Sequence, residues 1–121
     1  EEYTFSYIGR ERGTFKNTKV IDPLFGVDLA KELGRYDVYI SASRFDPGPN
    51  HILESLACKI PTYSFSDGGG ACEFTGPEHD YRSYQELETL LLSKEYKNNN
   101  VRTRSWKECM EELNENTLLK C

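Results

Sequence analysis

The sequence of 121 residues lacks a long hydrophobic run, and no stretch approaches the ~18–20 apolar residues that cross a bilayer. No segment combines the basic start and the apolar centre of a secretory leader. Basic residues are in the minority, because 15 Lys and Arg stand against 20 Asp and Glu, and the net charge is -5. A nucleic-acid partner, which normally needs a basic face, is therefore not expected. We expect a cytoplasmic protein, and peripheral membrane association of a full-length protein stays open.

Cysteine is scarce as well. The four cysteines, at positions 58, 72, 109 and 121, form no C-x-x-C pair, and their spacing matches no zinc ribbon or finger. Disulfides are rare in a reducing cytoplasm. The sequence therefore predicts neither a disulfide framework nor a metal site, and Cys58 is interpreted as a small core residue.

The sequence does not open with methionine, and its single methionine is Met110. The first expected strand begins almost at once, at Tyr3. We interpret the chain as a fragment of a longer protein, so that part of a binding site lies outside these residues.

Apolar patterning predicts alternating strands and helices. Strands are expected at 3–8, 19–21, 37–41 and 61–65, and helices at 27–33, 51–58, 84–92 and 104–113. Gly34 is the expected C-cap of the first helix, while Asn50 and Ser83 are expected N-caps. Such alternation is typical of right-handed β-α-β units. The predicted fold class is α/β, a three-layer Rossmann-like parallel sheet with helices on both faces, and residues 1–121 form a single domain.

Polar residues follow two expected strand ends. Asp46 lies in a Gly/Pro-rich turn, Asn50 opens a helix and Glu54 lies one turn further, while a glycine run at 68–70 leads to Glu73. In parallel sheets ligands bind outside the carboxyl ends of the strands, so these elements are expected at one edge. A helix N-terminus binds phosphate well, and a carboxylate accepts hydrogen bonds from the vicinal hydroxyls of a ribose.

Each of these residues also has an ordinary structural interpretation. Glu54 complements a helix dipole, Asp46 favours turns, and glycine runs serve turn geometry. Glu73 can cap the next segment. His51 faces either a ligand or the core. His79, in a polar loop, is expected to be solvated, and the aromatic side chains of Tyr39, Phe45, Tyr63 and Phe65 are expected in the core or in a pocket wall.

The segments YDVYISAS, DPGPNHILE, LACKIP and GGACE occur in this order within residues 36–73. Together they resemble the C-terminal, donor-binding half of GT-B fold glycosyltransferases, the retaining group called family 4 (glycosyl transferases group 1). In that family two acids lie eight positions apart and a GG-x-x-E turn follows. The resemblance covers residues 36–74 closely, and the rest of the chain only by the order of its elements.

The resemblance implies a role for each matched residue. Asp46 is the acid that contacts the transferred sugar, and we assign it the catalytic position. Gly48 and Asn50 lie near the donor phosphates and sugar, and Glu54 binds the ribose hydroxyls. Gly69, Gly70 and Glu73 match the loop that approaches the donor. We add His51 to the donor-binding residues because it is adjacent to Asn50 at the start of the helix.

The implied activity is transfer of a sugar from a nucleotide-diphosphate sugar to an acceptor, with retention and without a metal or other cofactor. The chain contains no Asp-x-Asp motif, which agrees with metal independence. An N-terminal acceptor domain is the expected missing partner, and the isolated fragment is expected to be inactive. A sugar-nucleotide epimerase of the same fold and a non-catalytic α/β interaction module remain alternatives.

The chain departs from the family pattern at several positions. Asp46 replaces the usual Glu and is one methylene shorter, and Pro49 removes one N–H donor. Lys59 replaces a common glycine, which favours a different helix ending. The basic pair that holds the diphosphate has no counterpart, because Arg10 and Arg12 follow the wrong strand.

Overall fold

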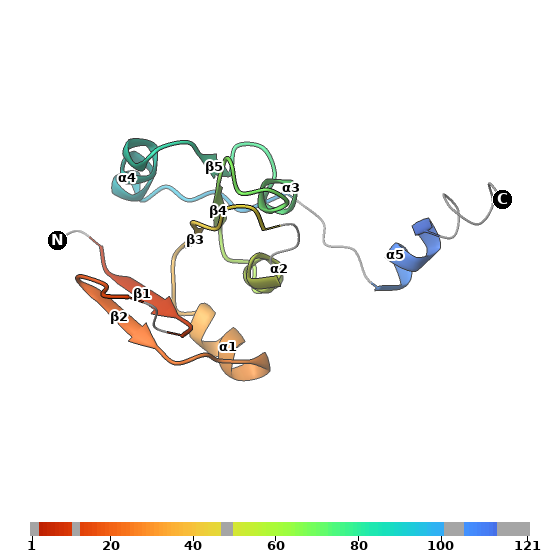
Figure 1. Ribbon diagram of the computed structural model, residues 1–121, viewed down its shortest axis with the longest axis horizontal. Coiled ribbons are helices and arrows are strands. Elements are labelled where there is room, and N and C mark those ends of the chain that lie inside the picture. Colours follow the sequence, from red (N-terminus) through yellow and green to blue (C-terminus); the bar gives the residue numbers. More distant parts are fainter. Residues whose placement is uncertain (1–2, 11–12, 47–49, 101–105, 114–121) are drawn as a thin grey trace.

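The computed structural model describes residues 3–10, 13–46, 50–100 and 106–113, and its strands form two parallel sheets (Figure 1). The first sheet pairs β1 with β2, and the second has the order β3-β4-β5. The strand bounds are β1 Phe5–Ile8, β2 Thr18–Ile21, β3 Tyr39–Ser41, β4 Thr62–Phe65 and β5 Asp80–Tyr81. The four expected strands are confirmed within one or two residues at each end.

Five helices are formed by the described residues. Their bounds are α1 Gly26–Leu33, α2 Asn50–Ala57, α3 Ala71–Thr75, α4 Tyr84–Ser93 and α5 Trp106–Leu113. The four expected helices are present, whereas α3 and β5 were not predicted because elements of five and two residues are too short to show a periodic pattern.

The α/β class is thus confirmed, but one continuous sheet is not formed among the described residues. In Figure 1 the β1–β2 pair and α1 lie to one side of the three-stranded sheet, and α5 lies beyond α3 at the opposite end. β1 and β3 each pair with one neighbour, and residues of both strands line the space between the two sheets.

The core surrounds the three-stranded sheet. Its most buried apolar side chains come from α1, α2, β4, β5, α3 and α4 and the turn before β4: Leu33, Ile52, Ile60, Tyr63, Ala71, Tyr81 and Leu91. Parallel strands are normally covered on both faces. β4 meets this expectation, since Thr62, Tyr63 and Ser64 are all buried, whereas β1 has an exposed Phe5.

Hydroxyl groups occupy the centre of this core. Thr62 Oγ1 donates to the carbonyl of Ile60 at 2.8 Å and lies 3.0 Å from Ser55 Oγ, which donates to the carbonyl of Ile52 at 2.8 Å. On the same strand Ser64 Oγ lies 2.8 Å from Thr75 Oγ1 of α3. The buried hydroxyls are thus hydrogen-bonded, as burial of polar groups requires.

Asn99 fastens the chain after α4 to β4. Its Oδ1 accepts from the Thr62 amide at 2.9 Å, and its Nδ2 donates to the carbonyls of Thr62 and Thr75 at 2.8 Å each. The side chain therefore takes the place of a neighbouring strand at the start of β4.

His79 lies in the same region and is buried, with only 6% of its surface exposed. Its Nε2 lies 2.8 Å from the carbonyl of Lys97, and its ring packs 4.9 Å from that of Tyr63. The expected solvation of His79 is therefore wrong, because the segment after α4 folds back over the loop that carries it.

Two of the three expected helix caps are confirmed, and the third is not. Ser83 caps α4 by accepting from the Glu86 amide at 3.2 Å, and the Gly34 amide closes α1 on the carbonyl of Ala30 at 3.0 Å. Asn50 is not a cap, because it already belongs to α2.

Lys59 does not alter the end of α2. Its amide bonds to the Leu56 carbonyl at 2.9 Å, and the next amide, of Ile60, bonds to the Ser55 carbonyl at 3.3 Å. These two bonds define the Schellman ending that a glycine usually adopts, and Lys59 reaches it with a left-handed φ of 59°. The predicted change of helix ending is therefore wrong.

None of the helices in the described ranges is both long and apolar enough to cross a membrane.

Candidate functional site

The turn after β3 and the glycine run after β4 meet in space. Asp46 and Gly69 form an isolated parallel bridge, and the Gly70 amide donates to the Asp46 carbonyl at 2.9 Å. The two segments that the sequence places at one edge of the sheet are thus joined by their backbones. Gly48 and Pro49, within residues 47–49, lie outside the described residues.

Close approach explains two of the glycines. A Cβ on Gly68 would lie 2.8 Å from the Phe65 carbonyl oxygen and 2.9 Å from that of Ser43. Gly69 has a φ of +70°, and a Cβ there would lie 3.0 Å from the Asp46 carbonyl oxygen. Both contacts are with backbone atoms, so a side chain at Gly68 would require the backbone to shift, and one at Gly69 would be both crowded and strained by the positive φ.

The same contacts occupy most amides of the run. Gly68 N–H is bonded to the Phe65 carbonyl at 2.9 Å, and Gly70 N–H to Asp46. Within the described part of the chain, the Gly69 amide is the only one of the three without a hydrogen bond, and Gly69 is exposed. The run therefore offers a ligand one amide, whereas the sequence suggests a cradle of several.

His51, in the first turn of α2, contacts the end of β3. Its Nε2 lies 3.1 Å from the Oγ of Ser41, and its ring centre lies 6.1 Å from that of Tyr39. Ser41 is only 4% exposed, and its Oγ accepts from the Ser43 amide at 3.3 Å while its carbonyl accepts from the Tyr81 hydroxyl at 2.8 Å. Ser41 is thus a fixed support for the imidazole.

Sequence reasoning missed Ser41. The only signal is its position as a small residue at the end of a strand, which does not distinguish a histidine partner from a core residue. A serine hydroxyl keeps one proton and one lone pair after accepting from Ser43, so it fits either tautomer of His51.

Burial lowers the pKa of His51 below its ordinary value, and the carboxylates of Asp46 and Glu54 act in the opposite direction. Burial has the larger effect, so the imidazole is neutral near pH 7. The charges of both acids of the sequence motif therefore act on the pKa of His51.

Glu54 lies on the exposed surface of α2, three residues after His51 and hence on the same side of the helix. Burial raises the pKa of Tyr39 to about 12, and the charges of Glu54 and Tyr7 add to this effect. The Tyr39 hydroxyl therefore stays protonated and remains a hydrogen-bond donor at neutral pH.

The other two candidate residues, Asn50 and Glu73, lie at the starts of α2 and α3. Asn50 is exposed at the start of α2. Glu73 is exposed in the first turn of α3. Its amide bonds to the Gly70 carbonyl at 3.2 Å, so α3 begins directly from the glycine run.

Phe45 differs from its expected position. It is 81% exposed, not in the core or a pocket wall, and it has a left-handed φ of 56°. Such a φ is unusual for a bulky residue and directs the aromatic ring outward beside Asp46. The guanidinium of the preceding residue, Arg44, lies 5.0 Å from the centre of the Phe65 ring.

Comparison of this chain with family models, with curated proteins and with solved structures gives no match. Within the described residues, no group of three or more His, Cys, Asp or Glu side chains is placed to hold a metal ion.

Proposed function

We propose that this chain is the donor-binding, Rossmann-like domain of a glycosyltransferase that transfers a sugar from a nucleotide-diphosphate sugar. The observation that carries the proposal is the backbone bridge between Asp46 and Gly69, which brings the acidic turn and the glycine run to one rim beside His51 and Glu54. To bind a donor of this kind, a site needs acceptors for the hydrogen bonds of the sugar hydroxyls and N–H donors for the phosphate oxygens, within a few ångströms of each other.

The acids bind the hydroxyl-bearing parts of the donor. Glu54 is exposed on α2, where its two carboxylate oxygens can accept from both ribose hydroxyls. Asp46 is half-buried at the bridge and faces the transferred sugar in this assignment. The Asp46 backbone is held by the bridge to Gly69 and by the hydrogen bond from the Gly70 amide.

The diphosphate is the leaving group, so the reaction needs groups that stabilise developing negative charge. The first turn of α2, the Gly69 amide and the Arg44 guanidinium supply positive partial or full charge at this rim. Arg44 is a single cation, one fewer than the basic pair of the resembling family. Neutral His51 donates or accepts a hydrogen bond without adding charge.

The test is titration of the 121-residue chain with UDP-glucose and GDP-mannose, followed by amide NMR shifts. We expect shifts at Asn50, His51, Glu54 and Gly69, and weak binding because an acceptor domain is absent. Glu54→Gln should weaken binding about tenfold, equivalent to about 1.4 kcal/mol. Glu95→Gln, an exposed glutamate after α4, is the matched control and should leave affinity unchanged.

Shifts confined to α4 or β2, or equal affinities for the two glutamine variants, would exclude this site. Sugar transfer by the complete polypeptide, measured by product analysis, distinguishes a transferase from an epimerase of the same fold. The epimerase converts the donor itself and leaves no acceptor product.

A further inference from the structure

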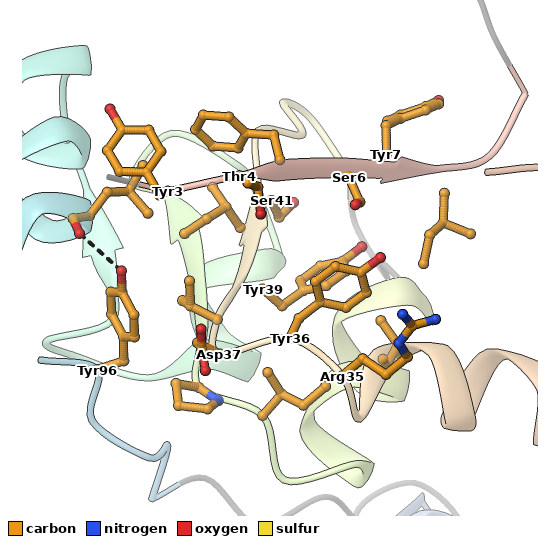
Figure 2. Close-up of a pocket in the computed structure, with 18 of the residues that line it drawn as sticks. Tyr3, Thr4, Ser6, Tyr7, Arg35, Tyr36, Asp37, Tyr39, Ser41 and Tyr96 are labelled. Atoms are coloured by element: carbon orange, nitrogen blue, oxygen red, sulfur yellow. Dashed lines mark hydrogen bonds between the residues drawn. The ribbon is translucent and has the colours of Figure 1, made fainter. Parts of the chain in front are cut away.

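A large cavity separates the two sheets. Its volume is about 1380 Å³, and it is lined on one side by residues 3–8 and on the other by residues 35–43 (Figure 2). Small-molecule sites usually measure about 300–1,000 Å³, so this space is larger than such a ligand needs. Its walls include one edge of β1 and one of β3 that pair with no other strand of the described residues, and a β-strand is an occupant that such edges would bind.

The unpaired edge of β1 can be identified from the hydrogen bonds. The Gly9 amide donates to the Ile21 carbonyl of β2 at 3.0 Å. Backbone groups point to alternate sides along a strand, so odd-numbered residues of β1 bond to β2 and even-numbered residues point away. Thr4, Ser6 and Ile8 therefore direct their N–H and C=O groups away from β2, and all three line the cavity.

The backbone groups of β3 alternate in the same way, between β4 on one side and the cavity on the other. The Tyr39 amide donates to the Pro61 carbonyl at 2.8 Å, so odd-numbered residues of β3 bond to β4. Val38, Ile40 and Ala42 direct their backbone groups away from β4, and all three also line the cavity. Two unused strand edges thus border one space.

Buried apolar side chains also line this space. Leu33 of α1, Leu91 of α4 and Ile60 before β4 line the cavity and are buried. Tyr7 of β1 and Tyr39 of β3 also line the cavity, one from each sheet. A strand in this position would contact these apolar side chains, and buried parallel strands are apolar throughout.

The order of the strands indicates where such a strand belongs in the chain. The chain passes outward from β1 to β2 and then returns to β3, β4 and β5 on the other side of the cavity. In doubly wound sheets of order 3-2-1-4-5-6, the strand at the point of reversal is the first in sequence. The position between β1 and β3 is that point of reversal.

We propose that the cavity receives one further β-strand, parallel to β1 and β3 and apolar on both faces, from a segment of the polypeptide that precedes β1. The strand joins the two sheets into one with the order β2-β1-X-β3-β4-β5, where X is the added strand.

The occupant can be tested with a blocked synthetic peptide, KVIVVIK, added to the 121-residue chain while amide hydrogen exchange is followed by NMR. The amides of Ser6, Ile8 and Ile40 should exchange at least tenfold more slowly with the peptide. The amides of Tyr7 and Tyr39, which already bond to β2 and β4, should not change. The peptide KVPVPIK is the matched control, because proline removes the donors that pairing needs.

Ser6→Pro tests the same edge from the protein side. The substitution removes an N–H directed at the cavity and leaves the bonds between β1 and β2 in place, so protection of the Tyr7 and Gly9 amides reports that β1 still forms. We expect this variant to bind KVIVVIK at least fivefold more weakly. Unchanged affinity in a variant with a normal β1 would overturn the proposal.

Three further outcomes would also overturn it. The peptide can leave the exchange rates unchanged, or the amides of Ser6 and Ile40 can be protected in the chain alone at every concentration, which means that β1 and β3 pair directly. Protection that appears only at high protein concentration means that a second copy fills the cavity.

The source is tested by joining KVIVVIK to Tyr3 through a helical segment of about 12 residues, the minimum for a parallel crossover. The same amides should then be protected at every protein concentration, and an unprotected edge in this fusion would contradict a preceding segment as the source. UDP-glucose shifts at Glu54 are read separately, so failure of strand binding and failure of donor binding are distinguishable.

Discussion

The backbone of Asp46 and that of Gly69, 23 positions later in the sequence, form a parallel bridge between two turns, and the glycine is required there by geometry. Gly69 has a φ of +70°, and the carbonyl oxygen of Asp46 occupies the space 3.0 Å from where a Cβ would lie. The acidic turn and the glycine run are therefore a single structural unit.

Gly69→Ala should lower the free energy of unfolding by about 2–3 kcal/mol, because it combines a strained left-handed residue with a backbone contact. Urea denaturation measures the change. Gly13→Ala is the control, since nothing lies within 4 Å of a Cβ at Gly13. The control should change stability by less than about 0.5 kcal/mol. Equal effects of the two substitutions would show that the turns do not meet.

His51 should titrate with a midpoint below 6.5, because burial lowers its pKa despite Asp46 and Glu54. A lowered pKa in the folded protein means that the unfolded chain takes up the proton first. The free energy of unfolding is therefore at its full value above about pH 6.5 and falls as the pH drops through the folded midpoint. Ring NMR signals give the midpoint, and denaturation at about pH 7.5 and 5.5 gives the stability.

Two variants separate the causes of this pH dependence. His51→Asn should remove the part of the stability loss between about pH 7.5 and 5.5 that comes from this ring. Asp46→Asn should lower the midpoint of His51 further, because it removes a nearby negative charge. A midpoint at or above 6.5 in the original chain would contradict the burial of the ring against Ser41.

Asn99→Ala should destabilise the protein by about 2–4 kcal/mol, since it removes three hydrogen bonds and leaves backbone groups of Thr62 and Thr75 without partners. Thermal or urea unfolding measures the effect. Asn98→Ala, at an exposed neighbouring position, is the matched control and should be nearly neutral. If both alanine variants unfold alike, Asn99 does not fasten the chain to β4.

Lys59→Gly should raise the free energy of unfolding by about 1 kcal/mol, because glycine adopts the left-handed φ of the Schellman ending without steric cost. The same change at Lys31, an exposed residue inside α1, should lower it by about 1 kcal/mol. Opposite signs for one substitution at two sites identify backbone conformation as the cause. Matching signs would contradict the left-handed assignment of Lys59.

The local structure follows from local chemistry, and much of it was predictable. Ser83 caps α4 because a serine oxygen reaches the Glu86 amide, and Gly34 ends α1. The proximity of Asp46 to the glycine run follows from the rule that parallel strand ends share an edge. These predictions need only the sequence pattern and the geometry of helices and strands.

The parts that sequence reasoning missed depend on contacts between distant residues. His79 is buried because Lys97 and Tyr63, which lie 18 and 16 positions away from it, surround its ring. The occupied amides of the glycine run depend on Asp46, and the support of His51 depends on Ser41. No local pattern encodes these pairs. The division of the strands into two sheets was missed for the same reason, because it depends on which strand edges pair with each other.

The hydroxyls at the centre of the core have a consequence for the response to temperature. The core buries four side-chain hydroxyls at positions where other proteins usually bury aliphatic carbon; they belong to Ser55, Thr62, Ser64 and Thr75. Exposing polar surface lowers the heat capacity of the unfolded chain, whereas exposing apolar surface raises it. The heat-capacity increase on melting should therefore fall below the usual ~12–15 cal/mol/K per residue, and calorimetry should record a broad, shallow stability curve.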